Sequence, residues 1–141
     1  MTSQTRRRPH AHPDPRLLAA VFAGGALGSL ARAGLAEALP HDVTAWPWPT
    51  FLVNLVGAAL LGYVVARLQH RAPPPTYRQS FLATGVCGGL TTFSTLQLEL
   101  VRMVDAGAWG LALGYATASV ALGFAAVALA IRLVRYREPA R

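Results

Sequence analysis

Residues 84–95 read TGVCGGLTTFST, and this stretch governs how the rest of the chain is interpreted. Its three glycines lower helix propensity, and four hydroxyl side chains follow within five positions. The stretch lies inside a predicted membrane-spanning helix at residues 77–103, which we expect to be interrupted over residues 85–91. In lipid, irregular backbone persists only where protein or a water-filled cavity satisfies its polar groups. The stretch is therefore a candidate ion or substrate site at mid-membrane.

The composition argues against an ordinary soluble globule. Hydrophobic residues make up 53% of the 141 residues, and charged residues only 13%. Apolar blocks of roughly the 20 residues that a spanning helix requires recur along the chain. They predict an all-α integral membrane protein with four transmembrane helices, at about residues 17–39, 50–70, 77–103 and 109–135. Residues 17–136 would form one transmembrane domain, with a disordered tail at 1–16 and a short tail at 137–141.

The basic residues are unevenly distributed along the chain. All 13 are arginines, and eleven lie at the ends of the apolar blocks on one side of the predicted membrane. Only Arg102 borders the other side, and Arg32 lies within the first span. By the positive-inside rule, this distribution predicts a multi-pass protein of the cell membrane with both termini cytoplasmic. The net charge of +7 could indicate nucleic-acid binding, but no basic face with interleaved aromatics accompanies it.

The N-terminal region also resembles a signal peptide, because arginines precede an apolar run. The run continues with helical spacing through Arg32 and Glu37, and three more spans follow, so a retained first helix is favoured. The single cysteine excludes an internal disulfide and a zinc site built from thiolates.

Proline marks two of the predicted connections. Residues 46–50 read WPWPT, which predicts a tryptophan anchor at the headgroup level and the start of the second helix. Residues 73–75 are three prolines, which predict a stiff cytoplasmic loop before the third helix.

The first predicted helix carries a face of small residues and one charge. Gly25, Gly28 and Arg32 share this face, and the glycines let a neighbouring helix approach closely. An arginine within a span is costly and normally faces protein, water or carbonyl groups. Two interpretations stay open for Arg32: its side chain reaches the outer interface, or it contacts an ion directly.

Polar residues on the other helices also have two interpretations each. Asn54 interrupts an otherwise apolar second helix, and it either strengthens helix packing or lines a polar pathway. Glu99 and Arg102 are three residues apart, which fits an interfacial ion pair. Tyr115 and Ser119 are four residues apart on one face, which fits either helix packing or a polar track.

The chain lacks the residue sets of common catalytic sites. No lysine follows the glycines, so a phosphate-binding P-loop is excluded, and no Ser/His/Asp set is available for hydrolysis. An interrupted helix instead offers unwound carbonyls to a cation, and half-helix N-termini and hydroxyls to an anion. The sequence therefore favours a channel or carrier over an enzyme.

Three motifs, in their order along the chain, resemble those of the Fluc/CrcB fluoride channels. They are GGALGSLAR at residues 24–32, TFLVNLVG at 50–57 and, above all, GVCGGLTTFST at 85–95. The third motif is highly specific, and the resemblance covers about residues 17–136. It implies a small four-helix subunit that forms an antiparallel dimer with two pores for passive fluoride export.

The resemblance also implies a set of site residues. A structural sodium ion (Na+), which is not transported, would be bound by backbone carbonyls of both subunits at the positions of Gly88 and Thr91. Fluoride is small and strongly hydrated, so the pore must replace its water with closely placed donors, and Phe93 would offer the positive edge of its ring. The residues implied for the fluoride pathway are Asn54, Phe93, Ser94, Thr95, Glu99, Tyr115 and Ser119.

The chain departs from the family pattern in two ways. The family usually reads TTFSTF, whereas Leu96 here cannot supply the second ring edge. Antiparallel homodimers need a chain that inserts both ways, and eleven arginines against one is a strong bias. We therefore hypothesise a heterodimer with an oppositely oriented paralogue, which could supply the second ring.

Two rival interpretations remain. A proton-coupled small multidrug transporter also has four helices, but it needs a carboxylate near the middle of the first helix, and Glu37 lies near the end. The second rival is an inactive membrane subunit that only supports the pores of a partner, and Leu96 is its main indication.

Overall fold

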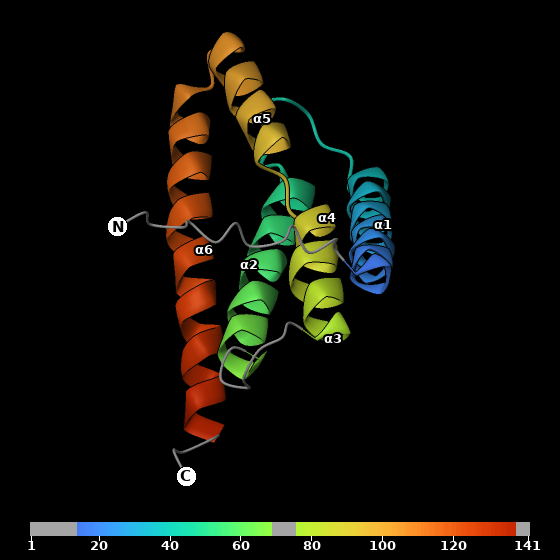
Figure 1. The fold of residues 1–141 in the computed structure, drawn as a ribbon. Helices are drawn as coiled ribbons and strands as arrows, with labels where there is room; N and C mark the ends of the chain where they lie inside the picture. The colour runs from blue at the N-terminus through green and yellow to red at the C-terminus, as the bar shows by residue number, and fades with distance from the viewer. Residues whose placement is uncertain (1–13, 69–75, 138–141) are drawn as a thin grey trace, which may run out of the picture.

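The computed structural model describes residues 14–68 and 76–137, and within these ranges the regular structure is entirely helical (Figure 1). The proline-rich loop at 73–75 and most of the predicted tails lie outside the described residues. The elements in chain order are α1 (Pro15–Ala38), α2 (Trp48–Leu68), α3 (Tyr77–Gln79), the π-helix η1 (Ser80–Cys87), α4 (Gly88–Leu90), α5 (Phe93–Asp105) and α6 (Trp109–Arg137).

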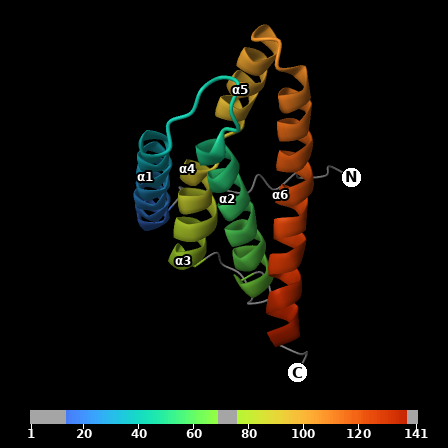
Figure 2. The same ribbon diagram turned by 180° about the vertical axis from the view of Figure 1, so that it is seen from behind.

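The chain makes four helical passes that stand side by side. The third pass consists of α3, η1, α4 and α5, of which the first three run into one another without a gap. Seen in Figures 1 and 2, α6 lies beside α2, α2 lies beside η1 and α4, and α1 covers the far side of η1 and α4. The polypeptide reverses direction from each pass to the next, so this is an up-and-down bundle.

Capping residues explain where two of the passes begin. The Asp14 side chain accepts a hydrogen bond from the Arg16 amide at 2.9 Å, so α1 starts inside the predicted tail. Thr76 caps α3 in the same way by accepting from the Gln79 amide at 3.3 Å. The two caps are neighbours, because the Tyr77 hydroxyl donates to Asp14 Oδ2 at 3.0 Å. The first and third passes therefore start at the same end of the bundle.

The up-and-down course gathers most described arginines at this same end. They lie in the first turn of α1, the end of α2, the start of the third pass and the last turns of α6. These arginines are Arg16, Arg67, Arg78, Arg132 and Arg135. Arg102 lies near the end of α5, at the opposite end of the bundle, so the charge asymmetry of the sequence becomes an asymmetry in space.

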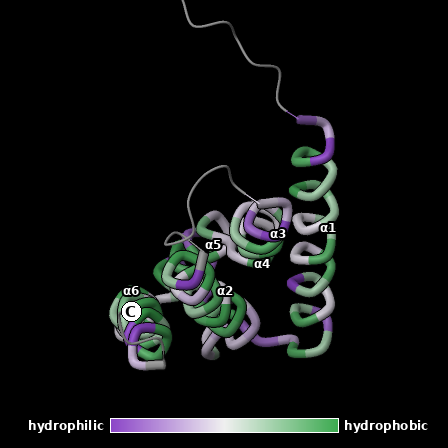
Figure 3. The backbone as a smooth tube through the Cα atoms, turned by 60° about the horizontal axis from the view of Figure 1, so that its bottom comes forward, coloured by the Kyte–Doolittle hydropathy of each residue, from purple (hydrophilic) through white to green (hydrophobic). Residues whose placement is uncertain are grey.

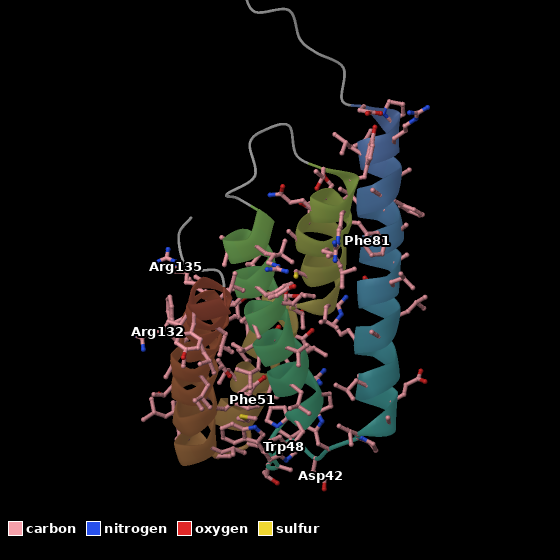
Figure 4. All side chains as sticks on the ribbon, turned by 90° about the horizontal axis from the view of Figure 1, so that it is seen from below. Asp42, Trp48, Phe51, Phe81, Arg132 and Arg135 are labelled. Carbon is pink, nitrogen blue, oxygen red and sulfur yellow. The ribbon has the colours of Figure 1, made fainter. Side chains whose placement is uncertain are left out.

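The contact between α1 and the third pass is made by backbone against backbone. Gly28 is buried, and a Cβ added there would lie 2.4 Å from the carbonyl oxygen of Val86. A Cβ added at Gly89 would lie 2.3 Å from the carbonyl oxygen of Gly25. Only glycine allows such an approach, which is the small-residue packing typical of membrane helices. Phe81 extends into the space between η1 and α1 (Figure 4).

The glycines of residues 85–89 therefore act differently from the prediction. We expected them to interrupt the helix, but Gly85 lies in η1, and Gly88 and Gly89 lie in α4. Tertiary packing against α1 compensates for their low helix propensity. This segment also contains the wide turns of the π-helix. Such turns are rare in proteins and frequently lie at functional sites.

The helical path is interrupted at Thr91 and Thr92, directly after α4 ends at Leu90. Thr91 has φ −77° and ψ 151°, and Thr92 has φ −147° and ψ 120°, so both are extended. Helical geometry resumes at Phe93. The interruption is thus shorter than the predicted one and lies at the pair of threonines.

The outer faces of the bundle are apolar and open. Phe22 on α1 is 79% exposed, and Phe124 on α6 is 75% exposed. Figure 3 shows hydrophobic residues along most of the helix lengths and hydrophilic ones mainly near the ends. Among the described residues, α1, α2 and α6 are each long and apolar enough to cross a membrane. Since such faces are stable in lipid and not in water, the chain is a membrane protein.

The backbone contact of Gly28 can be tested with a matched pair of variants. We expect Gly28→Ala to lower the free energy of unfolding by about 1–3 kcal/mol, because overpacking against rigid backbone costs this much. Gly34→Ala is the control on the same helix, since a Cβ there meets nothing within 4 Å. Thermal unfolding of both variants in detergent measures the difference. Equal stability of the two variants would show that α1 does not pack through its glycines.

Candidate functional site

The interruption at Thr91 and Thr92 is held by one side chain from α2. Asn54 Nδ2 donates to the Thr92 carbonyl oxygen at 3.0 Å, and Asn54 Oδ1 accepts from the Thr92 amide at 2.8 Å. The amide side chain therefore pairs with both backbone polar groups of one extended residue. In a protein interior or in lipid, each of these groups is costly to leave unpaired. This contact favours the packing interpretation of Asn54.

The hydroxyl of Thr92 begins the next helix. Thr92 Oγ1 accepts from the Thr95 amide at 3.2 Å, which is the usual geometry of an N-cap. The same hydroxyl donates to Thr95 Oγ1 at 2.9 Å and lies 3.4 Å from Ser94 Oγ. Thr92 is 6% exposed, so this small hydroxyl network is shielded.

These two interactions release two backbone carbonyls from helical hydrogen bonding. The Thr92 amide would donate to the Gly88 carbonyl in a continuous helix, but here it donates to Asn54. The Thr95 amide would likewise donate to the Thr91 carbonyl, but here it donates to Thr92 Oγ1. The freed carbonyls belong to the two residues expected to bind sodium. Their oxygens are hard ligands that suit such a cation.

A groove runs along the same segment between α2 and the third pass. Its volume is about 440 Å³, and its walls include Asn54, Gly88, Thr91 and Phe93. Phe93 is 72% exposed, so its ring is available to an ion or a neighbouring subunit. Gly57 makes room for this wall, because a Cβ there would lie 2.2 Å from Thr91 Cγ2.

A carboxylate connects three parts of the bundle beyond the interruption. Glu99 Oε1 accepts from the Thr50 hydroxyl at 2.6 Å, and Oε2 accepts from the Tyr115 hydroxyl at 2.7 Å. His41 Nε2 lies 3.9 Å from Oε1. Among the described residues Glu99 is thus paired with α2, α6 and the loop before α2, and not with Arg102 as the sequence spacing suggested.

Tyr115 and Ser119 differ in their surroundings, although they share a face of α6. Tyr115 is fully buried, and its ring packs at a centroid distance of 5.5 Å from Trp46 and 6.5 Å from Phe51. Ser119 Oγ is buried and finds no hydrogen-bond partner among the described residues. Burial of a polar atom costs free energy unless the atom finds a hydrogen-bond partner.

The tryptophans at the start of α2 also have different roles. Trp46 contacts Phe51 edge-on at 5.3 Å and is half-buried, so it belongs to the packing around Tyr115. Trp48 is 54% exposed and remains available as the anchor that the sequence predicts. Figure 4 shows Trp48 and Phe51 near each other at this end of the bundle, with Asp42 farther out on the loop.

Arg32 and Leu96 lie near the hydroxyl network and the cluster around Tyr115, respectively. Arg32 lines a cavity of about 200 Å³ together with Thr50, Thr92 and Thr95, so its side chain and the hydroxyl network border the same space. Leu96 packs against the buried cluster around Tyr115, on the inner side of α5. The structure thus brings Asn54, Gly88, Thr91 and Phe93 together at the groove and joins Tyr115 to Glu99, whereas Gly25 and Gly28 serve the α1 contact.

The family model described as CrcB-like protein, Camphor Resistance (CrcB), matches residues 19–131. The chain belongs to the CrcB family. The match covers all of the second and third passes, with the interruption, and most of the first and last passes.

Several curated CrcB relatives are similar over most of their length. The fluoride-specific ion channel FluC 1 of Mycolicibacterium paratuberculosis is 58% identical over 125 residues, which cover 89% of this chain and 95% of that protein. FluC 1 of Mycobacterium bovis is 57% identical over 86% of this chain and 92% of its own. FluC of Granulibacter bethesdensis is 40% identical, with 82% and 91% covered.

Three residues of the candidate site were not predicted from the sequence. Thr92 was seen only as one hydroxyl in a run, although Thr at an N-cap position before an amphipathic helix is a recognisable signal. Thr50 was assigned only to a helix start, and its pairing with Glu99 is 49 residues distant in sequence. His41 carries no local signal, because its position depends on how the loop folds back over α5.

The pairing of Asn54 with Thr92 gives a second prediction. Asn54→Ala should lower the free energy of unfolding by about 1–3 kcal/mol for each backbone group left unpaired. Amide hydrogen exchange in the peptide that contains Thr92 should also become faster. Val56→Ala is the control, because Val56 is 55% exposed on the same helix. Unchanged exchange at Thr92 in Asn54→Ala would contradict this role of the amide.

Proposed function

We infer that this CrcB chain is a subunit of a fluoride-specific ion channel and not an enzyme. The observation that carries this function is the 58% identity, over 89% of the chain, to a protein named as a fluoride-specific ion channel. A channel lets fluoride leave the cytoplasm passively, down its electrochemical gradient, and so lowers its concentration and toxicity. Hydrogen fluoride enters an acidified cell as a neutral acid and dissociates inside, which creates the need for such an exit.

The fluoride pathway we propose follows the polar side chains beyond the interruption. A small, strongly hydrated anion requires donors that replace its water one after another. Ser119 supports this route, because its hydroxyl is buried without a described partner. Phe93 supports it through an exposed ring beside the groove. The full set consists of Asn54, Phe93, Ser94, Thr95, Glu99, Tyr115 and Ser119.

The carbonyls of Gly88 and Thr91 are proposed to hold a structural sodium ion. Their helical donors are redirected to Asn54 and Thr92, so both oxygens are available to a cation. In the proposed antiparallel dimer the same pair from the second subunit would complete the ligand set. The ion would stabilise the interrupted third pass at mid-membrane and would not itself be transported.

The dimer is proposed to be a heterodimer with an oppositely oriented CrcB paralogue. Most of the described arginines gather at one end of the bundle, which favours a single orientation with cytoplasmic termini. Leu96 packs inward and cannot present a ring edge, so a partner could contribute the missing aromatic. The open apolar faces of α1 and α6 offer area for such pairing and for lipid contact.

Reconstitution into liposomes tests the function. We expect the protein, alone or co-purified with its paralogue, to release fluoride from loaded vesicles when a potassium ionophore carries the countercharge. Chloride-loaded vesicles should show no release above the protein-free background, because chloride accepts hydrogen bonds more weakly than fluoride and competes less well for hydroxyls that already have acceptors. A fluoride-selective electrode measures the fluoride release, and a chloride electrode the control.

The preparations separate the competing interpretations. Flux from both the single chain and the mixture would contradict the heterodimer, and flux from the mixture alone would support it. If flux from the mixture equals that of the paralogue alone, this chain is an inactive supporting subunit. The absence of fluoride flux from every preparation would overturn the proposed function.

Removal of sodium tests the cation site independently of transport. We expect the midpoint of thermal unfolding to rise with sodium concentration, since a ligand that binds only the folded state stabilises it by mass action, by about 2.7 kcal/mol at 100 times its Kd. A large organic cation should not replace sodium. Asn54→Ala should lose this response, because Asn54 no longer fixes the extended backbone of Thr92 and the Gly88 and Thr91 carbonyls lose their fixed positions. A sodium response that survives in Asn54→Ala would place the ion elsewhere.

A further inference from the structure

His41 is the one imidazole among the described residues, and it lies beside a pathway carboxylate. It comes from the loop between α1 and α2, and its Nε2 is 3.9 Å from Glu99 Oε1. The His41 side chain is 27% exposed and that of Glu99 is 11% exposed. The imidazole can therefore exchange protons with water, while the carboxylate next to it is largely shielded.

The carboxylate is already engaged on both oxygens. Thr50 donates to Oε1 at 2.6 Å and Tyr115 donates to Oε2 at 2.7 Å. The protons of these two hydroxyls are thus directed at Glu99 and are not offered to an ion in the pathway. An ionised Glu99 also repels fluoride, and its shielded position strengthens this repulsion.

A cavity at this end of the bundle joins His41 to the pathway. Its volume is about 170 Å³, and His41, Thr95, Glu99 and Arg102 line it. With a neutral imidazole, the charges of Glu99 and Arg102 cancel. With an imidazolium, the three side chains carry one net positive charge at the point where an anion passes between water and Thr95.

We propose that His41 is a positioning residue for fluoride conduction, acting through Glu99. Protonated His41 attracts the carboxylate, weakens its hold on the Thr50 and Tyr115 hydroxyls, and changes the cavity from neutral to anion-attracting. Fluoride flux then rises as the pH falls. This inference rests on the proposed function of the chain as a fluoride channel.

The other charged groups around the pair do not reverse this sign. Arg102 lines the same cavity and keeps its charge throughout this pH range, and Arg32 lines the neighbouring cavity with Thr50 and Thr95. Asp42 is exposed on the loop and points away from the bundle in Figure 4. The Tyr115 hydroxyl donates a hydrogen bond to Glu99 and keeps its proton. Histidine is the side-chain type whose ordinary change of charge falls between about pH 5 and 8.

Fluoride flux is measured in liposomes at equal pH on both sides, from about pH 5.5 to 7.5, across the imidazole range. The preparation used is the one that conducts, alone or with its paralogue. Only flux that requires the potassium ionophore is counted, because hydrogen fluoride crosses as a neutral molecule. The unmodified protein should gain about two- to fivefold in rate toward low pH, the factor that a partly exposed ion pair provides. His41→Asn should stay at the low rate, and His41→Arg should stay at the high rate.

Asp42→Asn is the matched control, because it removes an adjacent charge of the same loop and should keep the pH response. A pH response in His41→Asn equal to that of the unmodified protein would overturn the proposal. Equal rates for His41→Asn and His41→Arg at every pH would overturn it too. If the unmodified protein still conducts fluoride when either of these results is found, only the role of His41 is wrong and the channel function stands. If no preparation conducts fluoride, the channel function fails and this inference fails with it.

Discussion

The pairing of the Asn54 side chain with the backbone of Thr92 is the interaction on which the rest of the site depends. A continuous third helix would satisfy its own amides and carbonyls and present no polar backbone to an ion. Asn54 offers one donor and one acceptor in the spacing of a peptide group, so the chain can become extended without a polar group left unpaired. This pairing, which replaces the helical hydrogen bond of the Thr92 amide, explains three other features. They are the freed carbonyls of Gly88 and Thr91, the cap of α5 and the position of Phe93.

The backbone contact of α1 with the third pass confines this interruption to Thr91 and Thr92. Because Gly28 and Gly89 let α1 lie directly on the third pass, the segment before the threonines is held as a rigid helix despite its glycines. The change of geometry is then confined to Thr91 and Thr92 instead of spreading over the glycine-rich run. A confined interruption fixes the directions of its carbonyls, which a flexible one would not.

The sequence predicted the architecture better than the pairings within it. Four helical passes followed from the length and spacing of the apolar blocks, because hydrophobic thickness alone sets that pattern. The motif at residues 85–95 contains the interruption that the structure shows at Thr91 and Thr92. Glycine propensity misplaced its interruption, since propensity is local and the packing of Gly89 against Gly25 is not. The Thr50–Glu99 contact was missed for the same reason, because no local pattern around either residue indicates a partner 49 positions away.

The hydroxyls around the site are mostly committed to partners within the protein, and this limits how fluoride can pass. Thr91 donates to the Cys87 carbonyl, Thr92 donates to Thr95, and Tyr115 donates to Glu99. A permeating anion must therefore compete for protons that already have acceptors, one hydrogen bond at a time. Such exchange costs little for an ion that accepts hydrogen bonds strongly, and much for one that accepts them weakly. Selectivity for fluoride would then come from the existing hydrogen bonds as well as from the width of the route.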